Sequence, residues 1–314
     1  MYSFAIAADV GGTTVKLGLF DPDANLMDKW EIPTNTQDNG SHILPDIAAS
    51  VRERTAQLGL DLHHAAGMGV GVPGPVDEAG VVNGCVNLGW GTFNLTEELA
   101  RLLPEVPHFF AANDANAATL GELWQGGGKG CSDAVMLTLG TGVGGGVVHG
   151  GKILPGANGA AGEIGHMTVE PNETVVCNCG KRGCLEQYAS ANGIVFLAKR
   201  MLNECDTPSP LRNIPNCSAK DICDLAREGD PMAKQILNYC GRYLGLAMSY
   251  LACTVDTQIF LIGGGMSRAG DVLLNAIRPH YRSFAFHASA HTPIVTATLG
   301  NDAGIYGCAA MVLT

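Results

Sequence analysis

The chain has 314 residues and a formal net charge of −11 at pH 7, from 19 Lys and Arg against 30 Asp and Glu. This acidic balance disfavours nucleic acid as a partner, because such binding rests on Lys and Arg side chains that neutralise phosphates. Hydrophobic residues make up 46% of the chain and charged residues 16%, which excludes global disorder and allows a large folded core.

The N-terminal segment has no feature of export or membrane insertion. No basic residue precedes the apolar run that Asp9 interrupts, so a signal peptide is not expected. The longest uncharged stretch, 134–151, contains seven glycines and a histidine, a poor composition for crossing lipid. We therefore expect a cytoplasmic protein without a membrane segment, in which clustered cysteines bind metal rather than form disulfides.

Three glycine-rich turns follow apolar stretches. Residues 4–10 lead into the first turn and a second apolar stretch, and the same order returns at 134–150, so each segment predicts a β-hairpin. We interpret the two hairpins as the openings of two related lobes. A third turn follows the apolar stretch 258–262. The turns are Gly11-Gly12-Thr13-Thr14, Gly140-Thr141-Gly142 continuing to Gly146, and Gly263-Gly264-Gly265.

Backbone N–H groups in such turns can point at phosphate oxygens with no Cβ in the way, and threonine hydroxyls add further donors. One turn alone is equally consistent with a tight hairpin or a close contact between a helix and a strand. Three turns, with Asp9 and Lys16 beside the first, predict a nucleotide bound between lobes. No Walker A Lys-Ser/Thr pair is present in the sequence, which disfavours a P-loop NTPase.

An apolar stretch that ends at Ala112 leads through Asn113 and Asp114 into an alanine-rich helical segment. Asp114 therefore lies at the carboxyl end of a strand, where α/β sheets bind their ligands. From this position alone, an N-cap is the more common role of such an aspartate. Phosphoryl-transfer enzymes use an aspartate in the same place to orient the attacking hydroxyl and accept its proton.

A metal-binding pattern spans Glu163 to Glu186. His166 is followed, after ten residues, by Cys177, Cys179 and Cys184. One imidazole and three thiolates complete a tetrahedral Zn²⁺ site and leave no position for a catalytic water, so the predicted zinc is structural. The alternative is a set of reduced cysteines without metal, which the tight spacing and the glycines of the loop disfavour.

The second half of the chain has strong helical signals. Ser218 and Asp221 form a capping box, and Asp230-Pro231 begins a long apolar helix that extends to Leu251. Another helix is expected from about residue 271. The segment 302–313 has apolar residues at helical spacing, with Asn301-Asp302 available as a cap. Strands and helices mix in both halves, which indicates the α/β class.

The whole chain resembles the ROK family of bacterial sugar kinases, repressors and uncharacterised relatives, and within it the ATP-dependent glucokinases. The resemblance implies an actin-like (ribonuclease H-like) fold of two lobes with an interlobe cleft. We expect a small lobe of 1–113 plus 302–314 and a large lobe of 114–301 that carries the zinc loop 166–184. The resemblance rests on the motifs at 9–16, 71–76, 86–90, 113–116 and 139–146, and on 163–166 with the cysteine loop.

The resemblance also implies ATP-dependent phosphorylation of glucose at its 6-hydroxyl. Asp114 is then the base that accepts the proton, and Asp9 helps to hold the Mg²⁺ that bridges the ATP phosphates. Residues that bind sugar hydroxyls are expected to be Asn87, Asn113, Asp114, Glu163, His166 and Glu186, with His166 also a zinc ligand. Side chains of these types can hydrogen-bond a neutral sugar. The expected partners are a hexose, ATP and a second copy of the chain.

Two other functions stay open from the sequence. The N-acetylhexosamine kinases of the family share nearly all of these motif residues, and the segment 83–90 favours the glucokinases. A sugar-responsive repressor needs a helix-turn-helix domain before a first strand that begins here by Phe4, and the acidic charge and Asp114 count against it. The rank of hexoses, ATP against polyphosphate as donor, and regulation are not determined by the sequence.

Overall fold

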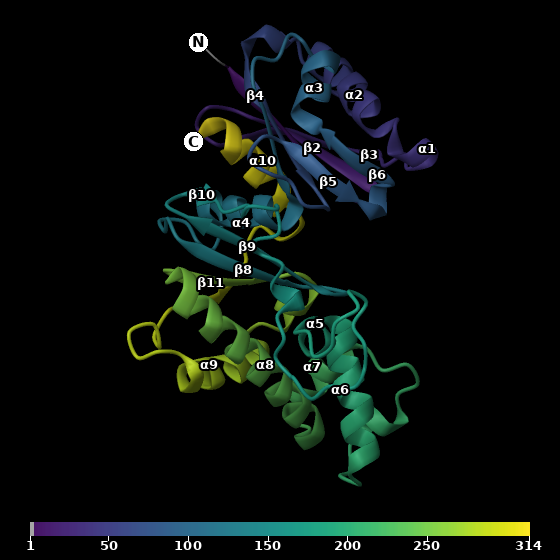
Figure 1. The fold of residues 1–314 in the computed structure, drawn as a ribbon, viewed down its shortest axis with the longest axis vertical. Coiled ribbons are helices and arrows are strands. Elements are labelled where there is room, and N and C mark those ends of the chain that lie inside the picture. Colours follow the sequence, from purple (N-terminus) through teal and green to yellow (C-terminus); the bar gives the residue numbers. More distant parts are fainter. Residues whose placement is uncertain (1–2) are drawn as a thin grey trace. The chain divides into compact units, whose positions relative to one another are not determined.

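The N-terminal hairpin forms strands β1 (Phe4–Val10) and β2 (Thr14–Phe20) in the computed structural model, which describes residues 3–314 (Figure 1). These strands belong to a five-stranded sheet of order β3-β2-β1-β4-β7. Strand β2 pairs antiparallel with β1 and β3, and β4 pairs parallel with β1 and β7. The carboxyl ends of β1, β4 and β7 therefore lie at one edge of this sheet.

The chain divides into two units. Unit 1 runs to Ser132 and adds Gly146–Gly162 and Leu299–Thr314, and unit 2 comprises Asp133–Gly145 and Glu163–Thr298. The expected small lobe falls within unit 1, but unit 1 also takes in 114–132, 146–162 and 299–301, which the sequence assigned to the large lobe. The division therefore differs from the expected one in these three segments.

Unit 1 contains, besides β1 and β2, β3 (Leu26–Pro33), α1 (Gln37–Gly40), α2 (Ile43–Gln57), β4 (Ala65–Val72), β5 (Val81–Cys85), β6 (Trp90–Asn94), α3 (Leu95–Leu102), β7 (Phe109–Asn113), α4 (Asp114–Gln125), β10 (Lys152–Ile153) and α10 (Ala303–Leu313), with 3₁₀ turns at Leu62–His64, Val86–Leu88 and Gly300–Asp302. Strand β9 (Val143–His149) crosses the division, and its last residues pair with β10.

Helix α4 groups with unit 1 because it packs against the C-terminal helix α10 with almost no space between their backbones. A Cβ on Gly121 of α4 would lie 2.2 Å from the carbonyl oxygen of Ala303, and one on Gly307 of α10 would lie 1.7 Å from that of Ala117. Only glycine allows this approach at either position. The C-terminal helix thus fixes the helix that begins with Asp114.

The two faces of the first sheet bury different clusters. Ile6, Ala8 and Val10 of β1 join a core that includes residues of α2 and α3, and Ala7 joins a second cluster with residues of α4 and α10. Successive side chains of a strand point to opposite faces. Asp9 therefore points to the face that α4 and α10 cover.

Unit 2 is built on the parallel strands β8, β11 and β12, with helices that pack around α8 (Figure 1). Helix α8 is capped by Asp230, whose carboxylate accepts the N–H of Ala233 at 2.8 Å. The predicted capping box of Ser218 and Asp221 is present at α7. The elements are β8 (Ala134–Leu139), α5 (Glu186–Ala189), α6 (Ala191–Glu204), α7 (Ala219–Glu228), α8 (Pro231–Val255), β11 (Ile259–Gly263), α9 (Asp271–Phe284) and β12 (Ile294–Thr296), with 3₁₀ turns at Ile164–His166, Pro210–Asn213 and Gly265–Ala269.

Two local expectations are corrected by the structure. The second glycine turn is shorter than predicted, because β9 already begins at Val143. Gly146 lies in that strand, where a Cβ would come within 2.1 Å of Thr119 Oγ1, so this glycine serves a helix–strand contact. The cap expected before α10 is also absent: the Asp302 carboxylate makes no cap bond and instead pairs with Lys29 at 2.8 Å.

Among the described residues, no helix combines the length and apolar character needed to span a bilayer.

Candidate functional site

Asp114 is the first residue of α4, and Asn113 is the N-cap. The Asn113 side chain accepts the N–H groups of Ala115 at 3.0 Å and Asn116 at 3.3 Å, and it donates to the carbonyl of Gly74 at 3.3 Å. An amide oxygen therefore satisfies the first turn of the helix. The capping role considered for Asp114 belongs to its neighbour, although one Asp114 oxygen also accepts the N–H of Ala115 at 2.8 Å.

Asp9 lies near Asp114 and carries a perturbed carboxyl group. Burial raises the pKa of Asp9 from 3.8 to about 6, and the negative charge of Asp114 adds to this effect, while the charge of Lys16 acts against it. A Cβ on Gly304 would lie 2.5 Å from the Asp9 carboxyl carbon, so this carboxyl group lies against α10 at a position where only glycine leaves room for it. Two neighbouring carboxylates, one of them desolvated, form a site that favours a bound cation.

The first glycine turn, between β1 and β2, keeps its backbone partly accessible. The N–H of Gly11 donates to the carbonyl of Thr14 at 3.0 Å, which closes the turn, and a Cβ on Gly12 would meet no atom within 4 Å. Thr13 is exposed and Thr14 is partly exposed. The Lys16 ammonium donates to the carbonyl of Asn301 at 2.7 Å, which ties β2 to the segment that precedes α10.

Asn87 lies in the 3₁₀ turn Val86–Leu88 between β5 and β6 and is exposed. Burial raises the pKa of the nearby Cys85 thiol, and the charge of Asp114 adds to the rise. The β5–β6 hairpin is therefore within electrostatic reach of Asp114. Among the described residues, Asn87 makes no hydrogen bond to Asn113.

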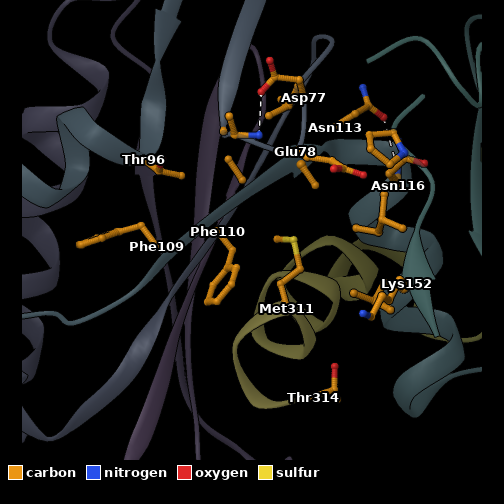
Figure 2. A pocket seen from close by; sticks show the side chains of 18 of the residues that line it. Asp77, Glu78, Thr96, Phe109, Phe110, Asn113, Asn116, Lys152, Met311 and Thr314 are labelled. Carbon is orange, nitrogen blue, oxygen red and sulfur yellow. Dashed lines mark hydrogen bonds between the residues drawn. The ribbon is translucent and has the colours of Figure 1, made fainter. Parts of the chain in front are cut away.

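A cavity of about 390 Å³ lies beside the β7 edge in unit 1. Figure 2 shows Phe110 and Met311 on its wall, with Asn113 and Asn116 at one end. Asn113 is the one predicted site residue on its lining, and Asp9, Asp114 and the first glycine turn do not line it. This cavity is therefore separate from the group of residues that the sequence predicts to react.

Two of the three glycine turns meet in unit 2. Strands β8 and β11 are parallel neighbours, with Gly263 opposite Thr138, so the turns that follow them lie at the same edge. Gly264 has φ +76°, and a Cβ there would lie 2.6 Å from the N atom of Leu139, one residue before Gly140. Gly265 and Gly140 have open space where a Cβ would point. Backbone groups of both turns can therefore approach one anionic ligand.

The predicted metal ligands come together. Ligand atoms of His166, Cys177, Cys179 and Cys184 all lie within 4.8 Å of one another. The Sγ atoms of Cys179 and Cys184 are 3.6 Å apart, and Cys177 Sγ is 4.0 Å from His166 Nδ1. Bond lengths of zinc to sulfur and nitrogen imply separations of about 3.5 to 3.8 Å in a tetrahedral site. The four side chains therefore fit Zn²⁺ in donor type and in spacing.

The imidazole of His166 also lies between two of the expected sugar ligands. Its Nδ1 atom is 3.8 Å from Glu186 Oε1, and its Nε2 atom is 4.0 Å from Glu163 Oε2. A metal on Nδ1 leaves Nε2 available for a second partner. Glu186 also touches the second glycine turn, since a Cβ on Gly142 would lie 2.9 Å from its Oε2. Unit 2 thus joins the metal ligands, two carboxylates and a phosphate-type turn.

Comparison with known proteins places this geometry in a family. A model of the ROK family matches residues 5–314. The chain belongs to the ROK family. A glucokinase of Halalkalibacterium halodurans is 40% identical over 309 residues, which cover 96% of this chain and 92% of that protein. An N-acetylmannosamine kinase of Escherichia fergusonii is 32% identical and covers 97% of this chain and 96% of its own length.

Among solved structures, a ROK family glucokinase of Streptomyces griseus, crystallised with glucose and AMPPNP, is 32% identical. It matches with a TM-score of 0.75 and covers 98% of this chain and 99% of its own. The expected α/β, actin-like sugar-kinase fold is therefore confirmed. The ROK motifs quoted from the sequence lie in both units of the structure.

Sequence reasoning missed residues of this ROK chain around the zinc loop. A cavity of about 260 Å³ is lined by Thr141, Gly142 and Glu186 together with Asn192 and Gly193 from the first turn of α6. The Ser190 hydroxyl caps that helix by accepting the N–H of Gly193 at 2.9 Å. A Ser-x-x-Gly pattern after Glu186 was the available signal. Glu173, which the sequence did not single out, is the loop's most deeply buried carboxylate.

Proposed function

We propose that this chain is an ATP-dependent glucokinase, which transfers the γ-phosphoryl group of ATP to the 6-hydroxyl of glucose. The observation that carries the reaction class is the pair of neighbouring carboxylates, Asp114 at the start of α4 and Asp9 with its pKa raised to about 6. The choice of glucose is supported by the glucokinase of Halalkalibacterium halodurans, which matches nearly the whole chain.

In this proposal Asp114 orients the 6-hydroxyl and accepts its proton as the new bond to phosphorus forms. Its position at the helix start stabilises the ionised carboxylate, which is tolerable because phosphoryl transfer depends mainly on positioning and charge. Asp9 would hold Mg²⁺, directly or through water, and the bound ion would supply positive charge to the ATP phosphates. Lys16 lowers the negative potential that the two aspartates create.

Binding of the sugar depends on hydrogen-bond acceptors and donors from several segments. We assign hydroxyl contacts to Glu163, His166 and Glu186, whose side chains are neighbours in unit 2. Asn113 and Asn87 are assigned the same role in unit 1. None of these residues is permanently cationic, and with Asp114 they include three carboxylates, so sugars that already carry phosphate or carboxylate are disfavoured by like charge.

The nucleotide is assigned to the glycine turns. The residues are Asp9, Gly11, Gly12, Thr13, Thr14 and Lys16 of the first turn, Gly140, Thr141 and Gly142 of the second, and Gly263, Gly264 and Gly265 of the third. The neighbouring second and third turns support this assignment, because their backbones meet at the ends of two parallel strands. We assign ATP and Mg²⁺ as cofactors, with polyphosphate as the donor to be compared.

We assign structural Zn²⁺ to His166, Cys177, Cys179 and Cys184, on the donor set and spacing described above. These four residues would hold the ion within the loop in which they lie, and as a complete set of ligands they would leave it no position for a reacting water. A role in glycolysis and a cytoplasmic location follow from the proposed reaction and remain predictions. A homodimer also remains a prediction, which light scattering tests.

A coupled assay with Mg²⁺ and ATP tests the function across glucose, mannose, fructose, N-acetylglucosamine and N-acetylmannosamine, with polyphosphate as an alternative donor. We expect the highest kcat/KM for glucose with ATP. The relative from Escherichia fergusonii makes N-acetylmannosamine the second candidate substrate. An N-acetylhexosamine preferred over glucose by about tenfold, a difference of about 1.4 kcal/mol, would overturn the choice of glucose and leave the kinase reaction standing.

A further inference from the structure

Glu173, in the middle of the zinc loop, is a buried carboxylate with four hydrogen-bond donors. Its side chain is 1% exposed. One oxygen accepts the Tyr188 hydroxyl at 2.5 Å and the Arg200 guanidinium at 3.0 Å. The other accepts the backbone N–H groups of Thr174 at 2.8 Å and Val175 at 3.0 Å. Both oxygens are therefore fully used as acceptors by the protein.

These donors come from three separate segments. Thr174 and Val175 belong to the zinc loop itself, Tyr188 belongs to α5, and Arg200 belongs to α6. Tyr188 is held in turn by stacking on Tyr243 of α8, with ring centroids 4.3 Å apart. The carboxylate of Glu173 thus links the zinc loop to helices α5 and α6. Glu186, a proposed sugar ligand, is the first residue of α5 and lies two residues before Tyr188, so the link reaches the helix that carries it.

The network requires a charged acceptor rather than any polar side chain. Burial raises the pKa of Glu173, but the Tyr188 hydroxyl, the two backbone N–H groups and Arg200 more than offset this and lower it to about 2. A glutamine of the same size would turn an NH₂ group toward two of the four donors. Leaving buried donors without an acceptor costs more than the bond itself contributes.

Metal binding and Glu173 act on different parts of the loop. The four metal ligands lie at His166 and within 177–184, whereas Glu173 fixes the segment between them. One other contact joins that segment to α5, a bond of 3.0 Å from the Gln187 side chain to the carbonyl of Val175. Backbone contacts tie both ends of that segment to the cysteine turn, by a bond of 2.8 Å from Val169 to Gly183 and by a bridge between Val176 and Arg182. The side chain of Glu173 attaches the centre of the segment to α5 and α6.

We propose that Glu173 is a positioning residue for Glu186: by tying the zinc loop to Tyr188 and Arg200, it holds α5 so that the Glu186 carboxylate stays beside His166. The proposal rests on the assignment of Glu186 to sugar binding made above. It predicts a defect in sugar affinity rather than in the chemical step, because Glu173 contacts neither of the proposed reacting groups. Loss of a hydrogen-bond partner that orients a metal ligand typically changes affinity or activity by about 10- to 100-fold, and we expect an effect of the same order for a group that orients a sugar ligand.

The test compares Glu173→Gln with a matched control, Glu204→Gln. Glu204 pairs with the same Arg200 at 3.4 Å, but its side chain is 66% exposed, so its loss leaves no buried donor unpaired. For Glu173→Gln we expect KM for glucose to rise about tenfold, with kcat and KM for ATP near wild type. Release of zinc to a chelator, measured without sugar or ATP, should also become faster. Glu204→Gln should match wild type in all four quantities.

Tyr188→Phe provides a second variant if Glu173→Gln does not fold. It removes one hydroxyl and keeps the ring stacked on Tyr243, and the same direction of change in KM for glucose is expected. A folded Glu173→Gln variant with an unchanged KM for glucose and unchanged zinc release would overturn the positioning role. A fall in kcat as large as the rise in KM for glucose would also overturn it. A wild-type protein that phosphorylates no glucose contradicts the proposed function instead, and zinc release then still tests the attachment of the loop.

Discussion

The negative charge of Asp9 lowers the stability of the folded chain. Its pKa in the folded chain is raised from 3.8 to about 6 by burial and by Asp114. A rise of this size corresponds to a cost of at most about 3 kcal/mol in the free energy of unfolding when the group is ionised. That is a large part of the roughly 5 to 15 kcal/mol by which domains are stable. We therefore predict that Asp9→Asn stabilises the protein without ligands, although it should lose activity.

The pH dependence of this gain follows from the two pKa values. Below pH 3.8 the carboxyl is protonated in both the folded and the unfolded chain, and the charge costs nothing. Between pH 3.8 and about 6 the folded chain keeps a proton that the unfolded chain has released, so wild-type stability falls as the pH rises. Above about pH 6 the full cost is present. Urea unfolding of both proteins should show a gain of about 1 to 3 kcal/mol at pH 8 and about half of it at pH 5.

Asp28→Asn is the control with the opposite sign. A hydrogen bond from Arg54 lowers the pKa of Asp28, and the two side chains form an ion pair. This variant should lose stability at pH 8, and the loss should shrink as the pH falls. Added Mg²⁺ should stabilise wild type and not Asp9→Asn, because only the carboxylate attracts the ion. An Asp9→Asn protein that is less stable than wild type at pH 8 would refute this account of Asp9.

Three further variants test other parts of the site. Asp114→Asn should bind glucose but lose about 10²- to 10⁴-fold in kcat, the range for removing a general base, and turnover close to wild type in the coupled assay would reject that role. Metal analysis should find about one zinc ion per chain in wild type and less in Cys179→Ser. The same variant should lose sugar affinity together with stability. Deletion of residues 302–314 should give insoluble or inactive protein, since α10 packs on α4 and β1, and an active soluble product would contradict this.

Local patterns predicted those features that depend on neighbouring residues. The capping box before α7, the Pro-initiated helix α8 and the cysteine cluster were all readable, because each depends on residues a few positions apart. The motif that places Asp114 at the start of a helix was readable for the same reason. Which residue caps this helix could not be predicted, because Asn113 and Asp114 are equally good caps. The choice depends on which side chain turns back to the helix.

Features that depend on tertiary contact could not be predicted. Glu173 contacts Tyr188 and Arg200, which lie 15 and 27 residues further along the chain. No periodic pattern connects the three residues. Gly146 was interpreted as part of a phosphate turn, because the sequence does not reveal that Thr119 packs where its side chain would be. The raised pKa of Asp9 likewise depends on α10, almost three hundred residues away in the chain.

The dependence of Asp9 on α10 bears on when this site can form. Gly304 leaves space for the Asp9 carboxyl, since a Cβ would lie 2.5 Å from its Cγ, and the Cys308 thiol donates to the carbonyl of Ala8 at 3.1 Å. Helix α10 therefore both buries Asp9 and fixes the strand that carries it. The same helix packs against α4, which begins with Asp114. Because α10 contacts both elements, the two carboxylates have the surroundings described here only when this helix is docked, and loss of that docking should lower the pKa of Asp9 toward its ordinary value.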